Sequence, residues 1–129
     1  MEMVASLFNS DNYTAVKKMM DVAALRHAAI ASNIANVSTP GYKRVDLGRT
    51  FEQELIKTND GRDAAKIAAL DPLVETDSLT PSTRADGNNV QLDSELLKLT
   101  TNTMNFDALS QFASGSLKQL RTAITGRPA

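Results

Sequence analysis

The chain has 129 residues, a formal net charge of -1 and no cysteine. Acidic and basic residues are interspersed, so no basic patch predicts nucleic-acid binding, and we do not expect nucleic acid as a partner. Disulfide and thiolate chemistry are excluded, and with a single histidine a zinc site would need three carboxylates, so we expect no metal and no cofactor.

The start of the chain does not resemble a targeting segment. Residues 1–13 contain no basic region and no continuous apolar stretch, so a cleaved secretory signal is not expected. No stretch approaches the roughly 18 consecutive apolar residues of a membrane span, so we expect no direct insertion into a membrane. On these grounds alone the protein is expected to be soluble and cytoplasmic, unless a signal without cleavage exports it.

The first predicted helix covers residues 12–36. Its apolar residues recur three and four residues apart, which is the period of a helix that packs lengthwise on another helix. We call these positions, together with those of the second helix below, the assembly seam. In the first helix the seam consists of Val16, Met20, Ala23, His27, Ile30 and Ile34. A lone histidine at such a position is more often a buried packing residue than a base or a ligand, and we interpret His27 in that way.

A sharp turn is predicted directly after this helix. Pro40 fixes its own φ at about −65° and keeps the preceding residue out of the helical region, so the helix has to end before it. Gly41 can supply the positive φ that the third position of a type II turn needs, and Asn36 suits a helix C-terminus. We expect this turn to point Tyr42 and Lys43 outward.

Residues 37–92 form the predicted middle segment, which is mostly polar and interrupted by glycine and proline. Residues 42–47 are expected to form a short extended run, and the apolar residues within 51–56 fit one or two helical turns. Residues 74–79 and 90–92 are candidates for a small β-hairpin. The rest of the segment is expected to be irregular, either flexible in the free monomer or ordered by neighbouring molecules.

The second predicted helix covers residues 93–126, with Asp93 as its N-cap. The assembly seam continues there at the same spacing through Leu96, Leu99, Phe106, Ala113, Leu117, Leu120 and Ile124. A second apolar row lies beside the seam and consists of Leu97, Met104, Ala108 and Phe112. The apolar surface is therefore wider than one partner helix needs, and a compact domain of this size would have difficulty covering it.

No set of residues in the sequence indicates a reaction. Asp86, Asp93 and Glu95 lie close together, but helix capping explains carboxylates there more simply than a catalytic pair does. The Asp86-Gly87 turn lacks the second glycine and the lysine of a phosphate-binding loop. The residues favour a mainly α-helical structural protein whose exposed apolar surface is completed by other copies of itself.

A string of residues at the end of the first helix carries a resemblance to a known family. The chain reads Asn33-Ile34-Ala35-Asn36 and then, after two residues, Thr39-Pro40-Gly41-Tyr42. This string, directly after a helix with a coiled-coil period, resembles the N-terminal signature of the flagellar rod, hook and hook-filament junction proteins. The segment 86–95 is similar to an element that proximal rod members of that family carry ahead of their C-terminal helix. We call the following residues the family turn motif: Asn33, Ala35, Asn36, Thr39, Pro40, Gly41 and Tyr42.

The resemblance implies a fold and a role that periodicity alone does not show. The N- and C-terminal helices are expected to pair antiparallel, as a coiled-coil-like unit joined by the largely irregular middle segment. The protein is expected to be a self-assembling structural subunit of the proximal rod in the bacterial flagellar basal body, where it transmits torque. This replaces the cytoplasmic expectation with the periplasmic rod, reached through the flagellar type III export apparatus without cleavage of a signal.

The expected partners follow from the same resemblance. They are copies of itself, other rod proteins, the adaptor that joins the rod to the membrane-embedded ring, that ring protein and the export apparatus. The alternative from another class is a helical adaptor or secretion chaperone, which would use the same seam to hold a partner helix and would form a discrete dimer. An enzyme, the third reading, would need a reaction that does not depend on His27.

Overall fold

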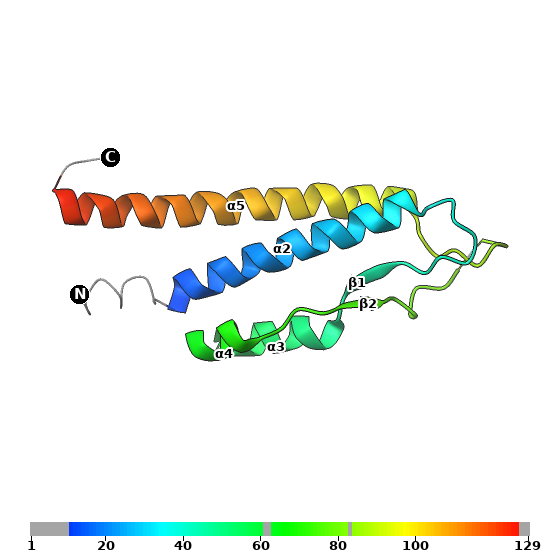
Figure 1. The fold of residues 1–129 in the computed structure, drawn as a ribbon, viewed down its shortest axis with the longest axis horizontal. Helices are drawn as coiled ribbons and strands as arrows, with labels where there is room; N and C mark the ends of the chain where they lie inside the picture. Colours follow the sequence, from blue (N-terminus) through cyan, green and yellow to red (C-terminus); the bar gives the residue numbers. More distant parts are fainter. Residues whose placement is uncertain (1–10, 61–62, 83, 127–129) are drawn as a thin grey trace.

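The computed structural model describes residues 11–60, 63–82 and 84–126. Its elements follow one another along the chain as α2 (Asp11–Ala35), β1 (Val45–Leu47), α3 (Arg49–Asp60), α4 (Ala64–Ala69), β2 (Val74–Thr76) and α5 (Leu92–Thr125). The two long helices α2 and α5 lie side by side and antiparallel, and α3 and α4 lie on the other side of α2 (Figure 1). This confirms the predicted fold, which is mainly α-helical with an antiparallel pair of terminal helices.

α2 is an alanine-rich helix that contacts other elements on two of its sides. Val22 packs against Leu47 and Phe51 on the side of α3. On the other side, the carbonyl of Ala23 accepts a hydrogen bond from α5. Alanine favours the helix and adds little volume, so neighbours on both sides approach the backbone of α2 closely.

α5 has 34 residues and spans about 51 Å at 1.5 Å per residue. It begins at Leu92, after Gln91, whose side chain makes no capping hydrogen bond, so the prediction of Asp93 as N-cap is wrong. The amide of Glu95 bonds to the carbonyl of Gln91 at 3.0 Å, which starts the helical ladder earlier than the cap signal indicated. The helix ends at Gly126, which has a left-handed φ of 64°.

β1 and β2 pair antiparallel in a two-stranded sheet. The register places Val45, Asp46 and Leu47 opposite Thr76, Glu75 and Val74, respectively. The extended run predicted ahead of α3 is therefore confirmed, whereas the predicted hairpin between 74–79 and 90–92 is wrong. The amide of Val90 donates to Oδ1 of Asn88 at 2.8 Å, so this amide is not available for a strand ladder.

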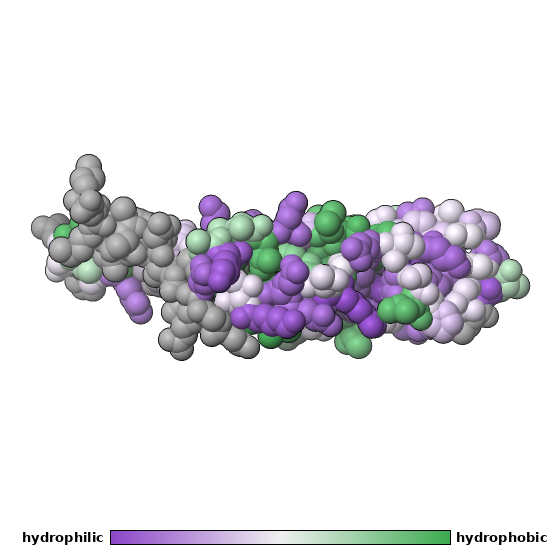
Figure 2. Space-filling model, turned by 90° about the horizontal axis from the view of Figure 1, so that it is seen from below, coloured by the Kyte–Doolittle hydropathy of each residue, from purple (hydrophilic) through white to green (hydrophobic). Residues whose placement is uncertain are grey.

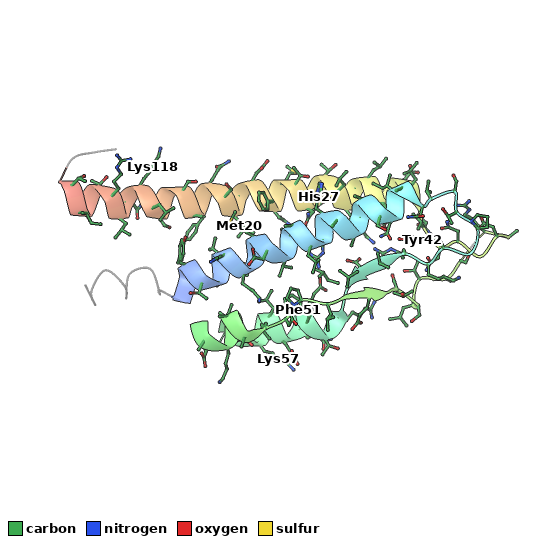
Figure 3. All side chains as sticks on the ribbon, viewed as in Figure 1. Met20, His27, Tyr42, Phe51, Lys57 and Lys118 are labelled. Atoms are coloured by element: carbon green, nitrogen blue, oxygen red, sulfur yellow. The ribbon has the colours of Figure 1, made fainter. Side chains whose placement is uncertain are left out.

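A small apolar core lies between α2 and α3. Its buried residues are Val22, Leu47 and Phe51, and Leu25, Leu55 and Leu70 pack around them. Phe51 lies between α3 and α2 (Figure 3). The helical turns predicted within residues 51–56 are confirmed and belong to the 12 residues of α3. α4 lies in a part of the middle segment that was expected to be irregular, and it contributes the buried Ile67. Asp63 caps its start, because the Asp63 carboxylate accepts from the amide of Lys66 at 3.1 Å.

The molecule is elongated along its two long helices (Figure 1). Hydrophilic side chains cover much of the face seen from the side of α3 and α4, with apolar side chains between them (Figure 2). Among the helices that the structure describes, none has the length and apolar character needed to cross a lipid bilayer.

Candidate functional site

The chain turns sharply between α2 and β1, at the end of the molecule where α5 begins (Figure 1). α2 ends at Ala35, before Pro40, as predicted. The amide of Tyr42 bonds to the carbonyl of Thr39 at 3.3 Å, and Gly41 between them has a φ of 73°. These observations confirm the predicted turn with a positive φ at its third residue.

Tyr42 folds back onto α2, so the prediction that it points outward is wrong. Its hydroxyl donates to Oδ1 of Asn33 at 3.2 Å and lies 3.2 Å from Oγ of Ser32. Both partners lie in the last turns of α2, so the half-buried Tyr42 is bound to that helix through its hydroxyl. Lys43 is exposed as predicted, and its Nζ donates to the carbonyl of Gly87 at 2.6 Å.

The remaining residues of the family turn motif are exposed or form local hydrogen bonds. Ala35, Thr39 and Pro40 are exposed. Nδ2 of Asn36 donates to the carbonyl of Ser32 at 2.8 Å, and the hydroxyl of Thr39 donates to Oδ1 of Asn36 at 3.2 Å. The carbonyl of Ser32 also accepts from the backbone amide of Asn36 at 3.1 Å, so Asn36 closes the last turn of α2 with both its amide and its side chain.

A second loop, residues 84–90, packs on this turn through the side chain of Asn88. Asn88 is 0% exposed. Its Nδ2 donates to three carbonyls of the turn, those of Asn36, Val37 and Thr39, at 2.9, 3.2 and 2.9 Å. The amide of Gly41 in turn donates to the carbonyl of Asp86 at 2.8 Å. One carboxamide therefore supplies hydrogen bonds to carbonyls that follow the end of α2 and have no partner in a helix.

Asn33, near the end of α2, connects this helix to β1 and α5. It is 0% exposed. Its Oδ1 accepts from the amide of Val45 at 2.8 Å, and its Nδ2 donates to the carbonyl of Val45 at 2.8 Å. The same Nδ2 donates to Oε2 of Glu95 at 3.0 Å. A single side chain therefore holds both backbone groups of a strand residue and the first turn of α5.

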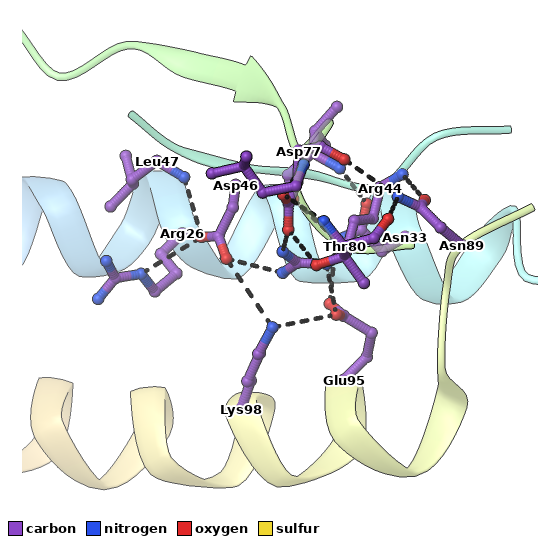
Figure 4. A network of polar contacts seen from close by, with 12 residues as sticks. Arg26, Asn33, Arg44, Asp46, Leu47, Asp77, Thr80, Asn89, Glu95 and Lys98 are labelled. Carbon is purple, nitrogen blue, oxygen red and sulfur yellow. Dashed lines mark hydrogen bonds and ion pairs between the residues drawn. The ribbon is translucent and has the colours of Figure 1, made fainter. Parts of the chain in front are cut away.

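The guanidinium of Arg44 is buried among carboxylates from α5, β1 and the segment after β2 (Figure 4). Its Nε donates to Oε1 of Glu95 at 3.1 Å, one terminal nitrogen donates to Oδ2 of Asp46 at 2.7 Å, and the other donates to Asp77. The backbone amide of Arg44 donates to Oδ1 of Asn89 at 2.7 Å. Because a guanidinium carries five donors in a fixed fork, it suits a position where several elements converge.

We call Asn33, Arg44, Asn88, Asn89 and Glu95 the polar junction.

The charged groups at the polar junction have shifted pKa values. Burial lowers the pKa of Arg44, but hydrogen bonds to Asp46 and Asp77 and the charge of Glu95 outweigh this effect, so the pKa of Arg44 is raised. The pKa of Asp77 is lowered, first by the hydrogen bond from the Thr80 hydroxyl and, against an opposing effect of burial, by Arg44. Both shifts favour the charged forms, so the ion pairs persist across the neutral pH range.

The polar junction joins elements of the fold, and its charges are paired with one another. A groove of about 430 Å³ beside Arg44 is lined by charged residues that include Asp46 and Lys98. Asp46 contacts three cations. Its Oδ2 lies 2.7 Å from Arg44 and 3.9 Å from Nζ of Lys98, and its Oδ1 lies 3.8 Å from Nε of Arg26. Within the described ranges, no group of three or more His, Asp or Glu residues could hold a metal ion. The geometry is that of a structural junction.

The chain is similar to flagellar rod proteins over most of its length. The sequence model of a family described as "Flagella basal body rod protein" matches residues 20–43. The chain is 31% identical over 115 residues to the flagellar basal body rod protein FlgB of Aquifex aeolicus, an overlap of 86% of this chain and 90% of the relative. It is 31% identical over 113 residues to FlgB of Bacillus subtilis (79% and 84%) and 29% identical over 124 residues to FlgB of Escherichia coli (84% and 88%). The chain belongs to the FlgB family.

Membership of the FlgB family makes this chain a structural, non-enzymatic protein of the flagellar basal body rod. The resemblance found in the sequence is confirmed, and the readings as a helical adaptor, a secretion chaperone or an enzyme are set aside. The matched residues 20–43 cover the second half of α2 and the turn after it. The segment matched by the family model therefore contains Asn33 of the polar junction.

The residues of the assembly seam on α2 differ in their exposure to solvent in this FlgB-family chain. Ala23 and Ile30 are buried, Val16, Met20 and Ile34 are half-buried, and His27 is exposed. The interpretation of His27 as a buried packing residue is therefore wrong. α5 covers one side of α2, and β1 and α4 cover another, so the strip of α2 that carries His27 faces solvent.

The α5 part of the assembly seam lies mostly at the surface of the isolated subunit. Leu99, Ala113 and Leu120 are half-buried, whereas Leu96, Phe106, Leu117 and Ile124 are exposed. In the second apolar row, Leu97, Met104, Ala108 and Phe112 are all exposed. The FlgB-family chain thus leaves an apolar strip along α5 uncovered, and the role of the seam in assembly stays a prediction.

The buried face of α5 carries polar residues that the apolar pattern did not indicate. Its buried residues are Glu95 and Asn102, seven positions apart. Nδ2 of Asn102 donates to the carbonyl of Ala23 at 2.8 Å, across the helix pair. The signal that could have found them is their heptad spacing, which places both on one face together with the half-buried Leu99. Arg44 and Asn89 carry no such local signal, because their partners are distant in sequence.

Proposed function

We propose that this chain polymerises through its two terminal helices, with copies of itself and with other rod proteins, and that the assembly transmits torque. The observation that carries the proposal is the apolar strip on α5, where Leu97, Met104 and Phe112 are 69%, 67% and 54% exposed. Extended apolar surface of this kind marks an interaction site. An interface that repeats without closing on itself builds a helical assembly such as a rod.

In this proposal the buried and the exposed residues of the assembly seam have different roles. The buried Ala23 and Ile30 hold α2 against α5 within one subunit. The exposed members on α5 contact neighbouring subunits and are Leu96, Phe106, Leu117 and Ile124. We regard residues 12–36, 37–92 and 93–126 as one rod-type domain, because the polar junction joins all three parts.

The proposal extends to location and partners. We infer that the protein is exported through the flagellar type III apparatus without cleavage of a signal and acts in the proximal, periplasmic part of the rod. Its neighbours there are other rod proteins, the adaptor between the rod and the membrane-embedded ring, and the ring protein. Membership of the FlgB family supports the rod as the location.

Substitutions on the exposed strip test the proposal. Phe112→Asp and Met104→Asp should leave the isolated chain folded, because both side chains are exposed. The same changes should prevent incorporation into the rod, since an unpaired carboxylate buried in an interface costs roughly several kcal/mol in every subunit. Gln111→Asp, at a neighbouring exposed position of α5, is the matched control.

The readouts are swimming motility, the presence of the protein in isolated basal bodies, and far-ultraviolet circular dichroism of the purified chain. We expect the Phe112→Asp and Met104→Asp strains to lose motility and rod incorporation while the purified variants keep their helical signal. The Gln111→Asp strain should swim. Normal incorporation of both apolar-strip variants would contradict the proposal.

A further inference from the structure

The apolar contacts between α2 and α5 do not by themselves determine how the two helices align along their common axis. The buried seam residues of α2, Ala23 and Ile30, are seven residues apart. The half-buried seam residues of α5, Leu99, Ala113 and Leu120, are also spaced by multiples of seven. A slip of seven residues therefore brings apolar positions back into contact. The seam residues that are fully buried, Ala23 and Ile30, both lie on α2. On α5 the buried positions are polar instead.

We propose that the polar junction, together with Asn102, sets the axial register of α2 against α5, while the apolar seam supplies stability without specifying alignment. A polar group buried at one position of a helix pair is known to fix register in this way, because its partner occurs at one place only. The residues named here act as positioning residues for the two helices that carry the exposed strip.

Glu95 and Asn102 make the seven-residue slip unfavourable in both directions. If α5 slides so that Asn102 takes the place of Glu95, the buried Arg44 loses a carboxylate that lies 3.1 Å from its Nε. If α5 slides the other way, Glu95 takes the place of Asn102 and its carboxylate faces the carbonyl of Ala23, which is an acceptor and not a donor. The first slip leaves Arg44 buried with one carboxylate fewer, and the second leaves a buried carboxylate against an acceptor.

Asn88 adds a second restriction at the start of α5. It precedes Leu92 by four residues, so an axial movement of α5 pulls its side chain out of the turn after α2. The turn then loses the three hydrogen bonds that Asn88 donates to Asn36, Val37 and Thr39. A buried carboxamide left without partners is costly, so the correct register is favoured over its alternatives.

The register can be measured as a distance between two spin labels in the full chain. The protein has no cysteine, so Ala31→Cys and Gln111→Cys carry the only labels. Both positions are exposed and lie on different helices, and a slip of seven residues moves them relative to each other by about 10 Å along the axis. Electron-electron double resonance on labelled chain diluted with unlabelled chain reports distances within one molecule, whether or not the chain polymerises.

Three variants separate register from stability. Glu95→Gln removes the charge facing Arg44, Asn88→Ala removes the donor in the turn, and Ile30→Ala removes apolar volume at a position that is 1% exposed. The parent and Ile30→Ala should give one narrow distance, although Ile30→Ala lowers the thermal midpoint. Glu95→Gln and Asn88→Ala should give a broadened distribution or a second distance displaced by about 10 Å.

Two outcomes would overturn the proposal. One is a distribution in Glu95→Gln and Asn88→Ala that is as narrow as in the parent, with a reduced thermal midpoint alone. The other is a broadening in Ile30→Ala equal to that of the polar variants. If Glu95→Gln does not fold, Asn88→Ser replaces it in the comparison, because Asn88→Ser changes the loop before α5 and no residue of α5 itself. We expect the same broadening of the distance distribution in Asn88→Ser.

Discussion

Nε of Arg44 lies 3.1 Å from Oε1 of Glu95, and this contact joins the residue before β1 to the first turn of α5. Both side chains are buried. A buried ion pair needs further hydrogen bonds to compensate for the lost hydration, and here Asp46 and Asp77 accept from Arg44 while Asn33 donates to Glu95. The middle segment is thereby attached to both long helices at one end of the molecule.

Removing the carboxylate of Glu95 should destabilise the subunit strongly. We expect Glu95→Ala to lower the free energy of unfolding by about 3 kcal/mol, because it leaves the Arg44 guanidinium buried with one partner fewer. Asp93→Ala, an exposed acidic residue in the same helical turn, should cost less than about 1 kcal/mol. Urea denaturation measures both, and equal losses in the two variants would refute this account of Arg44.

The contribution of Asp77 to stability should disappear in acid. Its pKa is lowered in the folded protein, so below an unfolded pKa of about 3.9 the unfolded chain binds protons more readily than the folded chain does. The stabilisation is therefore complete above about pH 5 and is lost as the pH falls through the folded pKa. The difference in thermal midpoint between the parent and Asp77→Asn should be largest near neutrality and shrink towards pH 2. If the difference in thermal midpoint does not change with pH, the ionised Asp77 carboxylate does not stabilise the folded protein in this way.

Two glycines should respond oppositely to the same substitution. Gly41 has a φ of 73°, so Gly41→Ala should destabilise the protein by about 1–2 kcal/mol, although an added Cβ meets no atom within 4 Å. Gly115 lies inside α5, and a Cβ there also meets no atom within 4 Å, so Gly115→Ala should stabilise by up to about 1 kcal/mol. Chemical denaturation measures the change in the free energy of unfolding for each variant. If Gly41→Ala stabilises the protein, the positive φ of Gly41 does not disfavour other residues at the turn.

The helices and the turn after α2 could be predicted from the sequence because their signals are local. The 3.5-residue period placed both long helices within a few residues of their observed bounds, and Pro40 with Gly41 indicated the turn. The face of α5 that meets α2 could not be chosen in this way. Apolar residues surround much of this helix, and the positions that the subunit buries, Glu95 and Asn102, are polar.

Contacts between distant segments were the part that sequence patterns did not indicate. β1 and β2 have three residues each, too few for a recognisable alternation, and their pairing spans the whole of α3 and α4. The sequence around Tyr42 indicated a turn, but it did not indicate that the Tyr42 hydroxyl donates a hydrogen bond to Asn33. The role of Asn88 depends on carbonyls about fifty residues earlier, which no local propensity describes.

Amide hydrogen exchange along α5 in the dilute, unassembled chain tests the central claim most directly. All 34 residues of α5 are described, and none after Asn102 is buried, although Ala113 and Leu120 are half-buried. The second half of α5 therefore has less of the tertiary cover that stabilises a helix than the first half. We predict strong protection around residues 95–102 and progressively weaker protection from 103 to 125, which rises on incorporation into the rod. Uniformly strong protection along the whole of α5 in the monomer would contradict the claim that this surface is completed by neighbouring subunits.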